Sequence, residues 1–224
     1  MTESEWLAST DPKKMLEFLR GNASKRKLRL FACGFCRQFW HLLTDKRSQR
    51  AVEVAERYAD GEETGEQLQL AQHQGHRATS EQDQLVHRQG HQSTRSHLPV
   101  LVTHAASVCC CGSAPAERIV LCLSMHGTEW QAYFLRDIFG DPFRPVSLAP
   151  AVLAWNDATV VRLAQAAYDQ RQLPEGTLDN GRLAVLADAL EEAGCTDADI
   201  LGHLRGTGPH VRGCRPVDLI LGKE

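Results

Sequence analysis

Apolar residues recur with helical spacing at both ends of the chain. From residue 11 to residue 61, and again from residue 128 onward, they return every three or four positions, which places them on one face of successive helices. No stretch alternates apolar and polar residues as a strand would. The pattern predicts an all-α protein, an irregular multi-helix bundle of about eight or nine helices, with helices over 11–21, 24–43, 45–61, 128–140, 156–170, 181–194, 197–206 and 216–222.

Residues that favour helix ends support several of these boundaries. Asp11 and Asp45 precede apolar periodic stretches and are expected to cap them, and Pro12 suits a first helical turn. Thr196 with Asp199 three positions later resembles a capping box, which predicts a helix start there.

The central part of the chain has a different composition. Residues 67–125 are rich in Gln, His, Ser and Thr, and no acid occurs between Asp83 and Glu117. We interpret them as a loosely ordered linker or diverged insertion, with short helices near 68–73 and 119–125. The expected organisation is therefore an N-terminal helical part (1–66), the Gln/His-rich segment (67–125), and a C-terminal helical part (126–224) that packs with the first as one domain.

Composition and charge narrow the class of protein. Hydrophobic residues make up 42% and charged residues 24% of the 224 positions, values typical of soluble globular proteins. The net charge of −3 gives no electrostatic reason to expect nucleic acid or an anionic membrane as partner. The polar, acidic start and the absence of a long apolar run predict a cytoplasmic protein, in which the eight cysteines would be free thiols.

Two groups of residues have the chemistry of metal ligands. Cys33 and Cys36 form a C-x-x-C pair, a spacing that zinc sites use, although here it falls inside a helical pattern, where two buried thiols are the alternative. The second group lies in "GCTDADILGHLRGTGPHVRGC" and contains Cys195, His203, His210 and Cys214. Zinc accepts two cysteines and two histidines, but ordinary helix ends and turns explain each of these positions as well. Zinc is therefore a possible cofactor, provided that the ligand atoms converge.

Other chemistry is less specific. Many Cys/His pairs are available for nucleophilic catalysis, so none is singled out, and no phosphate-binding loop or hydrolase motif occurs in a suitable context. The basic cluster Lys25, Arg26, Lys27 and Arg29 could contact phosphate, but a solvated helix face explains it equally.

Long blocks of the sequence resemble one protein family. The stretches "KLRLFACGFCRQFWHLL", "FLRDIFGDPFRPVSLAPAVLAWNDATVVRLAQAAYDQR" and "LAVLADALEEAGCTDADILGHLRGTGPHVRGC" are similar to a large paralogous family of uncharacterised planctomycete proteins. Some members carry automatic labels that link them to the SMI1/KNR4 group of interaction domains. Residues of about 70–130 depart from the relatives, as a diverged insertion or a compensated frameshift would. Translating the other reading frames tests the frameshift, which would yield an Ala- and Glu-rich helix.

These observations lead to three expectations about function. The first is a non-enzymatic protein-interaction or regulatory module with an unknown protein partner, because no catalytic constellation stands out. The second is a small zinc-binding helical protein that uses the cysteines and histidines above. The third and weakest is nucleic-acid binding through residues 25–29.

Overall fold

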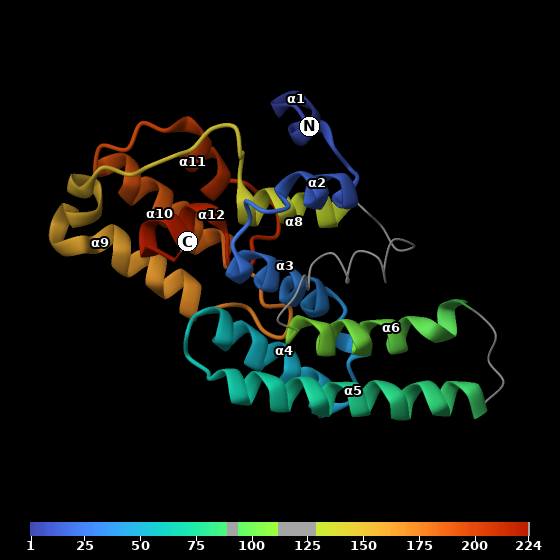
Figure 1. Cartoon of the computed structure of the whole chain (residues 1–224). Coiled ribbons are helices and arrows are strands. Elements are labelled where there is room, and N and C mark those ends of the chain that lie inside the picture. The colour runs from blue at the N-terminus through green and yellow to red at the C-terminus, as the bar shows by residue number, and fades with distance from the viewer. Residues whose placement is uncertain (89–93, 112–128, 224) are drawn as a thin grey trace. The chain divides into compact units, whose positions relative to one another are not determined.

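The computed structural model describes residues 1–88, 94–111 and 129–223, and this part of the chain is all-α (Figure 1). It contains eleven α-helices, slightly more than the eight or nine expected, and only isolated β-bridges. The chain divides into two compact units, which we call the N-terminal unit (Ser9–Ala132) and the C-terminal unit (Met1–Ala8 with Tyr133–Glu224). The predicted boundaries after residues 66 and 125 do not coincide with this division, and the packing of both ends as one domain stays a prediction.

The described part of the N-terminal unit contains five complete α-helices and one 3₁₀ turn. Asp11 and Asp45 cap α2 and α4 as expected: Asp11 accepts from two main-chain N–H groups of the first turn, and Asp45 accepts from one. Cys33, Phe35 and Cys36 on α3 are buried in the unit's core. The elements are α2 (Pro12–Leu19), α3 (Lys25–Gln38), the 3₁₀ turn η1 (Trp40–Leu42), α4 (Lys46–Ala59), α5 (Gly65–Arg88) and α6 (Thr94–Cys109).

The central segment is more ordered than its composition indicated. Helix α5 spans 24 residues and α6 spans 16, where we expected a linker with a short helix near 68–73. The buried face of α5 is made largely of small residues, and a Cβ on Gly75 would lie 3.0 Å from Cβ of Ser107 on α6 and 3.5 Å from Cβ of Ala51 on α4. A close approach through small residues needs no large apolar stripe, so the hydrophobic pattern missed it. The helix expected over 119–125 lies outside the described residues.

The C-terminal unit is built from short and medium helices around one core. Helix α9 is interrupted at Trp155–Ala158, where Asn156, Asp157 and Ala158 have positive φ, so a regular helix covers 159–169. Asp197, not Thr196, caps α11, because its carboxylate accepts from the N–H groups of the first turn. The elements are α1 (Glu3–Ala8), most of α8 (Glu129–Phe139), α9 (Pro150–Asp169), α10 (Asn180–Glu192), α11 (Ala198–Leu204) and α12 (Arg215–Leu221).

Within the described parts of the chain, no helix combines the length and the apolar character needed to cross a bilayer.

Candidate metal centre

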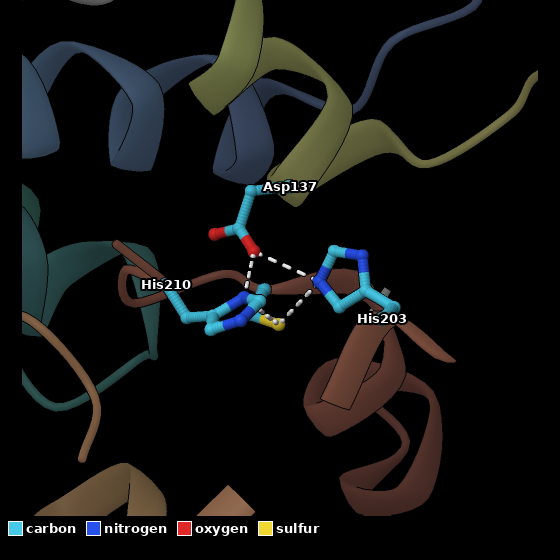
Figure 2. Close-up of side chains that lie close together, drawn as sticks. Asp137, His203 and His210 are labelled. Carbon is cyan, nitrogen blue, oxygen red and sulfur yellow. Dashed lines mark hydrogen bonds and ion pairs between the residues drawn. The ribbon is translucent and has the colours of Figure 1, made fainter. Parts of the chain in front are cut away.

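Four side chains of the C-terminal unit meet at one point. Asp137 comes from α8, His203 from the last turn of α11, His210 from the following loop, and Cys214 from the N-cap position of α12. One ligand atom from each lies within 4.8 Å of the other three. Figure 2 shows Asp137 and the two imidazoles pointing toward one another. No other group of three or more such residues converges in the described part of the chain.

The sequence places Asp137 on the buried face of its helix. Phe134 lies one turn before it and Ile138 directly after it, and both are buried in the unit. Asp137 is only 1% exposed, which is unusual for an acid. Its Oδ2 accepts a hydrogen bond from the N–H of Val211 at 2.9 Å, which anchors the loop that carries His210 to α8.

A tight turn then delivers Cys214 to the same point. The N–H of Cys214 donates to the carbonyl of Val211 at 2.9 Å, and Gly213 between them adopts a φ of 96°, which favours glycine. Earlier in the loop, the Tyr133 hydroxyl of α8 occupies the place that a Cβ on Gly208 would need. Gly208 therefore lets the loop run close to α8, and Gly213 allows the turn that precedes Cys214.

The distances between the ligand atoms are close to those of a tetrahedral shell. His203 Nε2 lies 2.9 Å from Asp137 Oδ1 and 3.3 Å from Cys214 Sγ. His210 Nδ1 lies 2.7 Å from the same Asp137 oxygen and 3.9 Å from Cys214 Sγ. Ligands held tetrahedrally at about 2.0–2.3 Å from zinc are about 3.3–3.8 Å apart. No two of the four ligand atoms are more than 4.8 Å apart, so shifts of about 1 Å would bring all four to that separation.

Burial and charge set the protonation of the group. Burial alone would raise the pKa of Asp137, but the hydrogen bonds from His203 and His210 outweigh it and lower the pKa to about 2. Burial, followed by the charge of Asp137, raises the pKa of the Cys214 thiol. Burial also raises the pKa of Tyr133 to about 12. The site thus holds a carboxylate that stays ionised and a thiol that keeps its proton until something replaces it.

The comparisons with known proteins found no match. No family model matches the chain, and no curated protein or solved structure is significantly similar to it. The resemblance to the planctomycete family and its interaction-domain label therefore stays a prediction, and the site is interpreted from its own geometry.

The structure divides the predicted ligands into three that converge, one buried nearby (Cys195), and two in the other unit (Cys33 and Cys36). His203, His210 and Cys214 come together as the zinc hypothesis required. Cys195 is buried in the core of the same unit and is not one of the four converging residues. Asp137 is the fourth converging residue, and the sequence pattern did not predict it as a ligand. The available signal was an acid on the apolar face of a helix, three positions after Phe134.

Cys33 and Cys36 belong to the N-terminal unit and have other neighbours. Cys36 Sγ lies 3.6 Å from Cys109 Sγ, and Cys33 Sγ lies 3.9 Å from the carbonyl oxygen of Val52. Burial raises the pKa values of Cys33 and Cys109. These positions agree with the alternative of buried thiols on a helix.

The basic cluster is largely engaged within its own unit. Arg26 forms an ion pair with the buried carboxylate of Asp60 at 2.9 Å. Arg29 is buried, donates to the carbonyl of Cys109 at 2.5 Å, and lies over the Tyr58 ring. Lys27 is also buried, which leaves Lys25 as the exposed member of the four.

Proposed function

We propose that this chain is a zinc-binding helical protein in which Asp137, His203, His210 and Cys214 hold one Zn²⁺. The observation that carries the proposal is that each imidazole directs a single nitrogen at both the carboxylate and the sulfur. Donor atoms that point at one common position are arranged as the ligands of a metal ion are.

The same geometry disfavours a catalytic Cys–His–Asp triad. In a triad, one imidazole nitrogen faces the nucleophile and the other faces the acid that orients the ring. His203 uses Nε2 for both contacts, and His210 uses Nδ1 for both. A nucleophilic cysteine also needs a lowered pKa, whereas burial raises that of Cys214.

The donor set favours zinc over other ions. Zinc binds thiolate, imidazole and carboxylate in tetrahedral geometry, whereas calcium and magnesium require oxygen ligands. One carboxylate and one thiolate would neutralise the two charges of Zn²⁺, so the loaded centre would be electrically neutral. This matters because Asp137, His210 and Cys214 are at most 1% exposed, and an unbalanced charge there would be costly.

A structural role fits the centre better than a catalytic one. Four protein ligands complete a tetrahedral zinc shell, whereas catalytic zinc keeps one position for water or substrate. Helices α11 and α12 have seven residues each, too few to be stable alone, and a shared ion would fix both to α8. A zinc-stabilised unit would suit the non-enzymatic interaction module that the sequence suggests, which stays a prediction.

Two cysteine variants test the proposal. The untagged chain, analysed by native mass spectrometry and elemental analysis, is expected to contain one zinc per chain. Cys214→Ser should lose the ion, whereas Cys195→Ser should keep it, since Cys195 is buried in the same unit outside the cluster. Absence of stoichiometric metal, or equal loss from both variants, would overturn the assignment.

A further inference from the structure

A cavity of about 420 Å³ lies beside the candidate metal centre, wholly within the C-terminal unit. Cavities of this size hold small organic molecules in other proteins. His203 lines it, and the side chain of His203 is 24% exposed while the other three metal-ligand candidates are buried. Much of the remaining wall is apolar, from Leu7, Val146, Ile200, Pro216 and Leu219.

The charged residues of this cavity are of two kinds. Arg144 is matched by acids, at 2.6 Å from Glu3 and 3.7 Å from Asp199. Arg215 is different: its Nη1 donates to the main-chain carbonyls of Phe139 at 2.8 Å and Asp141 at 3.5 Å. No carboxylate forms an ion pair with Arg215 among the residues that the structure describes. Its positive charge is therefore available to an anion.

Local structure holds the Arg215 side chain in place. It passes over Gly140, where a Cβ would collide with Cδ of Arg215, and Gly140 has a φ of 64°. The carbonyl of Gly140 accepts from Nε1 of Trp6 at 2.9 Å, and Arg136, which also lines the cavity, donates to the carbonyl of Trp6 at 3.3 Å. Hydrogen bonds to main-chain carbonyls thus hold the guanidinium groups of Arg136 and Arg215 in place.

We propose that this cavity binds a small organic carboxylate with an apolar body. The guanidinium of Arg215 would pair with the carboxylate, because its planar fork matches two carboxylate oxygens, and the apolar wall would cover the hydrocarbon. Asp141 and Asp199 also line the cavity and would repel a more highly charged group such as a phosphate. This site goes beyond the zinc proposal and does not depend on it.

Calorimetric titration of the whole chain of 224 residues with sodium octanoate tests the site. Octanoate should bind at millimolar concentration or below, and its neutral analogue octanamide should bind at least about tenfold more weakly. Arg215→Gln should weaken octanoate binding by about tenfold or more. Arg205→Gln is the matched control, because Arg205 pairs with Asp188 and Glu191 at an exposed position outside the cavity.

A second variant guards against a simple folding defect in Arg215→Gln. Gly202 lines the cavity on α11, and a Cβ there would meet no atom within 4 Å. Gly202→Leu should fill space in the cavity and reduce octanoate binding, while leucine favours the helix more than glycine does. The proposal is overturned if octanoate does not bind, if octanamide or octyl phosphate binds as well, or if both variants bind octanoate like the wild type.

Zinc content measured on the same samples separates the two proposals. If the protein as purified binds octanoate but contains no zinc, the metal assignment alone is overturned. Stoichiometric zinc without octanoate binding would overturn the cavity assignment alone.

Discussion

His210 Nδ1 lies 2.7 Å from Oδ1 of Asp137, a residue 73 positions earlier in the chain. The contact joins the loop between α11 and α12 to the buried face of α8. A second imidazole, that of His203, reaches the same oxygen at 2.9 Å. A single carboxylate oxygen therefore contacts both imidazoles of the candidate metal centre. Substitution of Asp137 should strongly reduce zinc binding.

Asp137→Asn is expected to abolish tight zinc binding while preserving the fold. The amide keeps the size of the side chain and can still accept from the N–H of Val211, but it removes the negative charge that the ion requires. We expect zinc affinity to fall by at least about 100-fold, measured by competition with a chelating dye. Asp188→Asn, an exposed change in the same unit, should leave the affinity unchanged. Unaltered affinity in Asp137→Asn would exclude this carboxylate as a ligand.

Zinc affinity should increase with pH. Burial raises the pKa of the Cys214 thiol, so the metal-free protein holds that proton at neutral pH, and zinc must displace it to gain a thiolate ligand. The low pKa of Asp137, about 2, means that this group has no proton to release. Displacement of one proton makes affinity rise by about tenfold per pH unit below the thiol pKa. Dye competition between pH 6 and pH 8 measures it, and an affinity independent of pH would count against Cys214 as ligand.

The sequence located three of the four converging residues because they lie within one short stretch. His203, His210 and Cys214 are separated only by a turn, so local spacing was informative. Asp137 was missed because its partner His203 is 66 positions away, and a helical pattern records an acid only as a polar position. Cys195 was included for its nearness in sequence, but its side chain packs into the apolar core of the unit and is not one of the converging residues. Convergence is a property of tertiary packing, which spacing along the chain does not contain.

The fold was easier to predict where capping residues and large apolar residues mark a helix. Asp11 and Asp45 located the starts of α2 and α4, and no strand was expected or found in the described residues. The full length of helix α5 was not predicted, because its buried positions include Ala71, Gly75 and Ala78. These small residues contribute close packing and little hydrophobic surface. A Gln- and His-rich composition then obscured a buried face made of small side chains.

Gly75→Leu should destabilise the N-terminal unit. A Cβ at this position would already lie 3.0 Å from Cβ of Ser107 and 3.5 Å from Cβ of Ala51, so a larger side chain must push α5 away from its neighbours. Overpacking of this kind costs about 1–3 kcal/mol, seen as a lower urea midpoint for the loss of helical circular dichroism. Gly65→Ala, at the start of the same helix with no atom near its Cβ, should be nearly neutral. Equal midpoints for both variants would contradict the close packing of α5.

Glu56→Gln tests the buried ion pair of the same unit. The Arg37 guanidinium donates to both oxygens of Glu56, at 3.0 and 2.7 Å, and its central carbon lies 4.3 Å from the centre of the Trp40 ring. Removing the carboxylate charge takes away the buried anion that the Arg37 guanidinium faces, which costs about 3–5 kcal/mol. Glu81→Gln removes an exposed partner of Arg47 and should change the urea midpoint little. If the two variants have the same midpoint, Arg37 and Glu56 do not form a buried pair in solution.

Removal of the metal should loosen one part of the C-terminal unit before any other. Helices α11 and α12 contribute Ile200 and Val217 to the same apolar core as α9 and α10, but each has only seven residues, so in the proposed centre they depend on zinc more than the longer helices do. Chelation is expected to speed amide hydrogen exchange across residues 198–221 at neutral pH and to leave α4 unchanged. Exchange in Cys214→Ser should resemble that of chelated wild type, and added chelator should alter it no further, because the site is already lost. Chelation that leaves residues 198–221 fully protected would show that packing alone holds these helices, and that the four side chains do not form a structural metal centre.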